Sequence, residues 1–502
     1  MTAAPAEQIW APPEPDPRRW VALAFIALAQ LMIALDATIV SIALPSAQSA
    51  LGASDADRQW VVTAYTLAFG GLLLLGGRIA DYVGRKRAFM IGLAGFALAS
   101  VAGGAAPDFG VLIAARAAQG AFAALLAPTA LSLLATSFTE PRERATAFAV
   151  YGSIAGSGAA IGMLLGGALT QYLSWRWCLY VNLPIAIAAA TGGWTVLKSS
   201  PSRGRPSFDV PGVLLIGVGL VSLVYGCTEA VRSGWTSATV IGLLAASAAL
   251  LVLFVVREAR TPNPLLPLRI VADRNRGGAY LAVGLALAGM FGAYLFLTYD
   301  FQVVLHYTPL AAGLAFLPIT VASQLGSWLI ARRLMPLVPP RVLMAPGALV
   351  AAAGLALLTQ LHGDSSFVSV VLPAEVLLGL GLSTAMVPAF STATHGVDQR
   401  EAGVASATVN AAQQVGASLG VAVLNTIAAA ATAGYSGPRA EAVLHGFAQA
   451  TAWGAGIMVL SAMAAAALIN APRPSRSLQP GFAGKRLNLG LDTAASTPYS
   501  SS

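Results

Sequence analysis

Long apolar runs fill most of this chain and constrain its fold more than any other feature. About fourteen runs of roughly 20 residues or more follow one another, joined by short polar connections. A helix of about 20 apolar residues crosses a hydrocarbon core of about 30 Å. Strands of a membrane barrel are shorter and alternate polar with apolar residues, which these runs do not. The sequence therefore predicts an all-α integral membrane protein with about 14 transmembrane helices.

Composition agrees with this prediction. Of the 502 residues, 57% are hydrophobic and only 10% charged, too few to coat a water-exposed surface. The net charge of +8 is no signal for nucleic acid, because the basic residues sit in short groups between apolar runs. The expected surroundings are a lipid bilayer. The predicted spans are roughly 20–45, 59–82, 88–106, 110–135, 145–172, 176–197, 209–228, 238–257, 277–301, 311–334, 341–361, 367–391, 402–430 and 444–470.

Basic residues are concentrated on one side of the predicted membrane. If both termini are cytoplasmic, nearly all arginines and lysines fall in inner loops, as the positive-inside rule requires. Dropping one helix would invert every later loop, so the bias supports the number of spans as well. The outer loops hold only Arg58, Arg176, Arg232 and Arg439.

A faint internal repeat divides the spans. Arg87-Ala-Phe-Met90 recurs as Arg341-Val-Leu-Met344, and the same offset carries the first span onto the ninth. We therefore expect two six-helix pseudo-repeat bundles with two helices inserted between them. The expected division is a cytoplasmic tail at 1–19, an N-terminal bundle at 20–197, the inserted pair at 198–257, a cytoplasmic loop at 258–276, a C-terminal bundle at 277–470 and a disordered cytoplasmic tail at 471–502.

The most specific motif joins the second and third spans. Its glycine, aspartate and basic residues keep a fixed order: Gly77, Asp81, Gly84, Arg85, Lys86 and Arg87. The motif resembles the signature loop of the major facilitator superfamily, G-x-x-x-D-x-x-G-R-K/R. The resemblance implies a tight cytoplasmic turn at Gly84 and a charge at Asp81 that latches one conformation of two rocking halves.

Further stretches resemble the fourteen-helix drug:proton antiporter branch of that family. They occur in the expected order over residues 20 to about 430, and are Leu35–Pro45, Arg116–Gly120, Trp175–Pro184 and Gln413–Gly420. The resemblance implies a bacterial inner (plasma) membrane protein that acts as a monomer. It implies export of a small amphiphilic organic compound, drug, antibiotic or metabolite, driven by the proton gradient without a cofactor.

One departure leaves an alternative open. The antiporter motif on the fifth span ends in G-P-x-x-G-G, and Met163 replaces its proline here. Uptake or uniport by the same fold is therefore the alternative function. The glycines Gly158, Gly162, Gly166 and Gly167 also form the small-residue stripe with which membrane helices pack.

Charged side chains within the spans are the candidate site residues. A charge near the bilayer centre costs at least about 2.5–3.5 kcal/mol, so it needs a partner or a function. Asp36 and Arg116 lie at matching depths on the first and fourth spans, which line the cavity of the resembling fold. We expect these two, with Glu375 on the twelfth span, to couple proton movement to transport. A structural ion pair is the alternative for Asp36 and Arg116.

The candidate substrate cavity extends this set with polar and aromatic residues. Its full membership is Asp36, Arg116, Gln119, Tyr294, Tyr299, Asp300, Gln302 and Glu375. For Asp300, an interfacial position is the alternative, and for the tyrosines it is helix anchoring.

Enzymatic and metal-dependent functions find little support. Gly416-Ala-Ser418-Leu-Gly420 matches a hydrolase nucleophile pattern, but it lies in an apolar helix and not in a strand–turn–helix. No nucleotide-binding phosphate loop occurs, and the four histidines have no metal-ligand spacing. The two cysteines, Cys178 and Cys227, are expected to be free. A membrane enzyme or sensor without transport is therefore the remote alternative.

Overall fold

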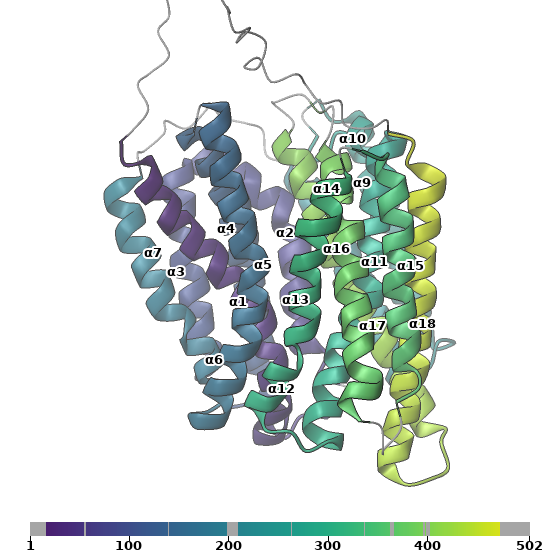
Figure 1. The fold of residues 1–502 in the computed structure, drawn as a ribbon. Coiled ribbons are helices and arrows are strands. Elements are labelled where there is room, and N and C mark those ends of the chain that lie inside the picture. Colours follow the sequence, from purple (N-terminus) through teal and green to yellow (C-terminus); the bar gives the residue numbers. More distant parts are fainter. Residues whose placement is uncertain are drawn as a thin grey trace, which may run out of the picture.

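Two bundles of long, roughly parallel helices form the molecule (Figure 1). The structure is a computed structural model that describes residues 17–54, 57–138, 140–197, 209–262, 264–335, 337–361, 366–394, 397 and 402–471. The tails expected at 1–19 and 471–502 therefore lie largely outside the described residues. So does the connection at 198–208. Helix α1 begins and α18 ends on the same side of the molecule in Figure 1.

The N-terminal bundle contains the first seven helices. In chain order these are α1 (Arg19–Leu51), α2 (Trp60–Val83), α3 (Arg85–Gly104), α4 (Phe109–Ser137), α5 (Pro141–Tyr172), α6 (Trp177–Tyr180) and α7 (Asn182–Val196). Helix α1 packs on α5 and α7, and α4 packs on α2 and α3. The Asp108 side chain caps α4 by accepting from the Val111 amide. Gly84 turns the chain between α2 and α3 at a φ of 96°, which favours glycine.

The inserted pair consists of α8 (Val210–Ser233) and α9 (Ala238–Arg260). The two helices pack on each other, and α8 also packs on α2 of the N-terminal bundle and α17 of the C-terminal bundle. Asp209 caps α8 and pairs with Arg257 of α9 at 2.6 Å. The short helix α10 (Leu268–Ala272) follows. The expected cytoplasmic loop at 258–276 is therefore partly helical.

The C-terminal bundle contains the remaining helices and three π-helical segments. In chain order these are α11 (Arg274–Tyr299), η1 (Asp300–Val304), α12 (Pro309–Ala315), α13 (Leu317–Leu325), η2 (Gly326–Ala331), α14 (Arg332–Leu334), α15 (Pro340–Leu358), η3 (Phe367–Val371), α16 (Leu372–Thr394), α17 (Ala402–Ala433) and α18 (Arg439–Leu468). Helix α16 packs on α11, α13 and α15, and α18 packs on α11, α15 and α17.

Helices lie over all fourteen predicted runs. Twelve helices in the described part are long and apolar enough to cross a membrane, and α2 adds a shorter apolar stretch at Trp60–Leu73. The membrane fold and helical class are thus confirmed. Boundaries differ by several residues: α1 continues to Leu51, and the run at 311–334 is broken into several segments. Pro318 and a π-helical turn at Gly326 interrupt that run.

The two bundles meet along α2 with α17 and α5 with α12. A Cβ on Gly70 would lie 2.7 Å from the Gln414 Cβ, and one on Gly313 would lie 2.6 Å from the Met163 carbonyl oxygen. Backbones approach this closely only where side chains are absent, which explains the glycines at these crossings.

Candidate functional site

The centre of the N-terminal bundle holds a buried ion pair. The Arg116 Nη1 atom of α4 lies 2.6 Å from Asp36 Oδ2 of α1, and both residues are almost completely buried. The structure brings the two together as their depths predict. Breaking such a pair by removing one partner costs about 3–5 kcal/mol, because the remaining charge stays buried.

Amide side chains complete the surroundings of the Asp36 carboxylate. Asn182 Nδ2 donates to Oδ1 over 2.7 Å and Gln119 Nε2 donates to the same oxygen over 3.0 Å. Both amides also donate to the Ser100 hydroxyl oxygen, at 3.3 Å and 2.7 Å respectively. All three are fully buried, so helices α1, α3, α4 and α7 each contribute a member to one network.

Arg116 is held from its other side by α2. Its Nε atom donates to the Val61 carbonyl oxygen over 3.1 Å, and its guanidinium carbon lies 4.3 Å from the centre of the Tyr65 ring. A guanidinium over an aromatic face is attracted by the ring's negative face. Arg116 therefore links α2 to α1 through Asp36, and a change at Asp36 alters the forces on three helices.

The network fits the ionised form of Asp36. An ionised carboxylate only accepts hydrogen bonds, and Asp36 receives three donors, from Arg116, Gln119 and Asn182. A protonated carboxyl would direct its own hydrogen at one of these donors. Protonation therefore requires that the network rearranges.

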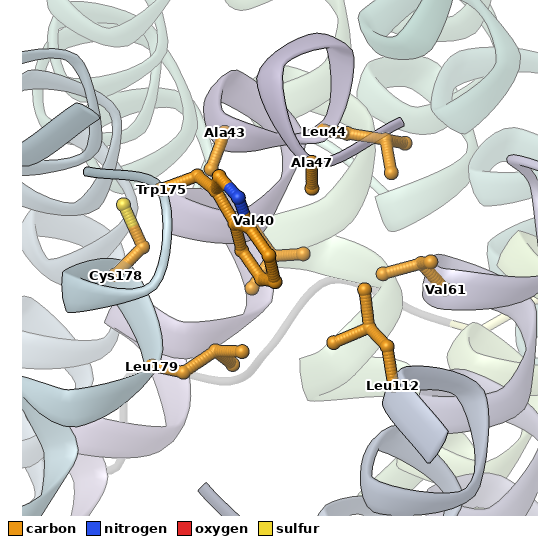
Figure 2. A pocket seen from close by; sticks show the side chains of 9 residues that line it. All are labelled: Val40, Ala43, Leu44, Ala47, Val61, Leu112, Trp175, Cys178 and Leu179. Atoms are coloured by element: carbon orange, nitrogen blue, oxygen red, sulfur yellow. The ribbon is translucent and has the colours of Figure 1, made fainter. Parts of the chain in front are cut away.

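A small apolar pocket lies beside the network (Figure 2). Its α1 residues follow Asp36 along the helix, and its α4 residue precedes Arg116 by four positions. The pocket is therefore displaced from the ion pair toward the side where α1 ends. It is lined by Val40, Ala43, Leu44, Ala47, Val61, Leu112, Trp175, Cys178 and Leu179. The apolar side chains of this lining therefore lie between the ion pair and the side of the molecule where α1 ends.

The acidic candidates of the C-terminal bundle lie apart from this network. Glu375 is fully buried on α16, and neither of its carboxylate oxygens has a hydrogen-bond partner in the described part of the chain. Helices α11 and α13 pack on α16, and α13 comes closest at Ile319, whose carbonyl oxygen would lie 2.3 Å from a Cβ on Gly379, one turn after Glu375. Asp300 is buried in η1, and its Oδ2 atom also lacks a partner among the described residues.

Tyr299 and Gln302 connect the two bundles where α1 ends. The Tyr299 hydroxyl donates to the Gln48 side-chain oxygen, and the Arg58 guanidinium lies 4.0 Å over the Tyr299 ring. Gln302 Nε2 donates to the Ile42 carbonyl oxygen over 2.9 Å. In this conformation, both candidate cavity residues hold the bundles together at that end.

At the signature loop, the structure shows the turn and some of the basic residues. Lys86 Nζ donates to the Trp194 carbonyl oxygen over 2.6 Å, so it ties α3 to α7. Arg78 on α2 donates to the Pro264 carbonyl oxygen over 2.6 Å, next to the inserted pair. The side chain of Asp81 lies outside the described part, so its latch role stays a prediction.

The glycine stripe of α5 packs on both bundles. Gly158, Gly162 and Gly166 face α1, where a Cβ on Gly162 would lie 2.7 Å from the Leu35 carbonyl oxygen. Gly167 faces α12, with 2.8 Å between its would-be Cβ and the Leu310 Cα atom. These close approaches support the packing role of the stripe.

Three members of the site were missed by sequence reasoning: Ser100, Asn182 and Tyr65. Asn182 did carry a signal, because it stands in the stretch Trp175–Pro184 that resembles the antiporter branch. Ser100 and Tyr65 are ordinary residues of apolar helices and carried none. The described residues contain no group of three or more histidine, cysteine, aspartate or glutamate side chains that suits a metal. Ser418 lies inside α17, so its hydrolase-like pattern has no strand–turn–helix context.

Known proteins agree with this architecture. Residues 26–421 match the model of the Major Facilitator Superfamily. The chain is 52% identical over 465 residues to the puromycin resistance protein of Streptomyces alboniger, covering 91% of this chain and 92% of that protein. It is 40% identical over 427 residues to the cephamycin export protein of Amycolatopsis lactamdurans, covering 84% and 87%.

Solved structures show the same fold. A bacterial homologue of the human lysosomal transporter Spinster, in an inward-facing and unoccupied conformation, matches with a TM-score of 0.65 at 16% identity. The match covers 92% of this chain and all of that one. The resemblance predicted from the motifs is thus confirmed, and exporters of this kind use no cofactor. The chain belongs to the Major Facilitator Superfamily and is a multi-pass membrane transporter, not an enzyme.

Proposed function

We propose that this transporter exports an amphiphilic antibiotic or drug from a bacterial cell in exchange for protons. The observation that carries the proposal is the buried Asp36–Arg116 pair with its three donors to one carboxylate. The names of the puromycin and cephamycin relatives support an antibiotic as substrate. We infer that the coupled ion is a proton because the Asp36 carboxylate can bind and release one.

Asp36 acts as the proton carrier in this proposal. When it is ionised, it holds Arg116, Gln119 and Asn182, which come from α4 and α7. A proton on the carboxylate cancels the attraction to Arg116 and introduces a donor among donors. Helices α1, α4 and α7 must then shift relative to one another, which changes the face on which the central cavity opens. Release of the proton on the other side restores the network.

At the end of the molecule where α1 ends, contacts between the two bundles close the structure, as one state of this cycle requires. The contacts of Tyr299 with Gln48 and of Gln302 with Ile42 cross between bundles at the end of α1. With both termini cytoplasmic, as the basic residues predict, that end faces outward. The described conformation is then closed to the outside. The transporter is proposed to act as a monomer, since each chain contains both bundles.

The signature loop is proposed to latch this state. Gly84 sets the turn, and the motif places Asp81 one turn before it. Asp81→Ala should leave membrane insertion intact and reduce transport in everted vesicles severely. Lys198→Ala, two positions after the last residue of α7, is the control because it removes a charge that the basic-residue pattern assigns to the same side and that lies outside the motif. Transport near the wild-type rate in the Asp81 variant contradicts the latch.

The experiment that tests export uses everted membrane vesicles. The wild-type protein should accumulate a fluorescent dye when a proton gradient is imposed, and an uncoupler should release the dye. Asp36→Asn keeps the shape of the side chain but cannot ionise, and its NH2 group imitates the donor of a protonated carboxyl. This variant should bind the dye and fail to accumulate it. Dye accumulation that survives the uncoupler would show that the proton gradient does not drive transport. Loss of dye from the vesicles when the gradient is imposed would instead indicate uptake into the cell.

A further inference from the structure

A second group of buried charges lies at the start of α8 and the end of α9, outside the central network. Asp209 and Glu258 have exposed fractions of only 5% and 3%. Asp209 Oδ1 accepts from the Gly212 amide over 3.1 Å and from Arg257 Nε over 2.6 Å. Glu258 Oε2 accepts from the Leu266 amide over 2.9 Å. Each carboxylate therefore has one oxygen that accepts hydrogen bonds and one that remains.

The two remaining oxygens lie around the same spot. Neither Asp209 Oδ2 nor Glu258 Oε1 has a hydrogen-bond partner in the described part of the chain. A Cβ on Gly212 would lie 2.6 Å from the first and 3.1 Å from the second, so the two oxygens lie no farther apart than the sum of these distances. An ionised carboxylate only accepts hydrogen bonds, so two ionised groups would leave two buried acceptors side by side. One proton held between them satisfies both oxygens.

The charges around the pair also favour one bound proton. With both carboxyl groups ionised, Arg257 balances only one of the two negative charges. Two carboxylates in one site hold a single proton in common, because like charges at short range cannot both ionise readily. With that proton in place, Asp209, Glu258 and Arg257 are neutral as a group.

Glu258 also fixes the residues that precede α10. Its Oε2 atom holds the Leu266 amide, and two positions earlier the Pro264 carbonyl oxygen accepts from Arg78 Nη2 of α2 over 2.6 Å. Helix α2 ends at the signature loop, so the Glu258 carboxyl acts on the segment that contacts this end of α2. Asp209 is fixed by two donors, whereas Glu258 has a longer side chain. Repulsion between the two ionised groups would therefore move Glu258 and loosen the segment.

We propose that Asp209 and Glu258 share one proton and form a pH-sensitive clasp that holds residues 264–267 against α2. Helix α10, which follows these residues, lies at the same end of the molecule as the start of α1 (Figure 1). With both termini cytoplasmic, as the basic residues predict, the clasp responds to the cytoplasmic pH. As the pH rises, the shared proton passes to solvent, the acid–carboxylate pair becomes two carboxylates, and the clasp opens. This proton is separate from the one that Asp36 is proposed to carry.

Other titratable groups near the pair are few. Helices α2, α9 and α17 pack on α8, and α10 packs on α9. Helix α17 contains no titratable side chain, and the next one along α8 is Tyr225, about 24 Å from Asp209. Arginines stay charged throughout the pH range of proteins. The remaining groups are Arg257 and Arg260 of α9, Arg269 of α10, and Tyr65, Arg78, Asp81 and Tyr82 of α2.

The test measures amide hydrogen exchange of residues 264–267 in the purified full-length protein in detergent micelles, corrected for the intrinsic pH dependence of exchange. Proline has no amide hydrogen, so this stretch reports only Leu265 and Leu266. In the wild-type protein, the protection of Leu266 should be constant at low pH. It should fall by up to about tenfold per pH unit at higher pH, because opening releases one proton.

Glu258→Gln is the variant that closes the clasp permanently. Its NH2 group can donate to Asp209 Oδ2 at every pH, while its oxygen still accepts from the Leu266 amide. The protection of Leu266 should therefore stay at the low-pH value of the wild type. If protection in Glu258→Gln falls with pH as it does in the wild type, the proposal is overturned.

Two glycine variants keep both acids and change only the space between them. Gly212→Ala places a methyl group against both oxygens, so protection at low pH should fall and its pH dependence should flatten. Gly217→Ala on the same helix, with no atom within 4 Å of the new Cβ, is the matched control and should behave as the wild type. A wild-type pH dependence in Gly212→Ala would overturn the proposal. So would its disappearance in Asp36→Asn or Asp81→Ala, because the titrating carboxyl would then lie outside the pair.

Discussion

Asn182 provides a sharp test of the network around Asp36. Its Nδ2 atom donates to Asp36 Oδ1 over 2.7 Å, and both residues are fully buried. Asn182→Ala removes this donor and leaves Arg116 and Gln119 in place. A hydrogen bond to a charged group contributes about 1.5–3 kcal/mol. Only the ionised carboxylate benefits fully from it, so its loss makes release of the Asp36 proton harder by that amount.

The consequence is a shift of the pH profile of transport toward higher pH. At 1.36 kcal/mol per unit, the loss corresponds to about one to two pH units. The sign follows because a destabilised carboxylate keeps its proton until the solution is more alkaline. The assay is dye efflux from proteoliposomes over a series of internal and external pH values. Ser100→Ala is the matched control, because Ser100 contacts Asn182 and Gln119 but not Asp36.

The result that refutes this reasoning comes from a double variant. If Asn182 acts through Asp36, then Asn182→Ala should shift the pH dependence of dye binding in the wild-type protein but not in Asp36→Asn, which has no carboxyl to titrate. The same change in both backgrounds would mean that Asn182 supports packing only. A profile that moves toward lower pH would contradict the geometry directly, because it would require Asn182 to stabilise the protonated carboxyl.

Two further predictions concern stability in detergent. Gly162→Ala should lower the free energy of unfolding by about 1–3 kcal/mol, because its Cβ would lie 2.7 Å from the Leu35 carbonyl oxygen. Gly71→Ala, with no atom within 4 Å of the new Cβ, should have no such cost, and equal thermal shifts would contradict the packing argument. At the start of α5, the hydrogen bond from Arg19 holds the pKa of Glu143 below its usual value. Glu143→Gln should therefore destabilise at neutral pH, and the difference should narrow as pH falls below about 4; a difference that grows in acid would contradict the pairing.

The fold could be predicted from the sequence because the lengths of the apolar runs and the positions of the basic residues between them can be read from the chain directly. It also paired Asp36 with Arg116, since a rise of 1.5 Å per residue converts position into depth. Depth along a helix does not tell in which direction a side chain points, and this explains why sequence reasoning missed Asn182. Asn182 follows the short helix α6, and the break between α6 and α7 prevents any depth from being counted through it. Only the folded chain shows its amide directed at Asp36.

The same limit applies to the C-terminal bundle. Tyr299, Gln302 and Tyr294 all appeared as aromatic or polar residues near one end of a span. The folded chain distributes them differently, because the first two contact α1 and the ring of the third packs on Phe316. The π-helical turn that begins at Asp300 changes the phase of the helix at this point. A phase change of this kind has no signature in the composition of the span.

The measurement that tests the central claim most directly is proton movement driven by substrate. Purified protein is reconstituted in liposomes that contain pyranine, and a gradient of a transported dye is imposed. The account predicts that the wild-type protein moves protons against the direction of the substrate and that the internal pH changes. Asp36→Asn should bind the same compound and leave the internal pH constant. A pH change of wild-type size in the Asp36→Asn liposomes would contradict the claim that Asp36 carries the coupled proton.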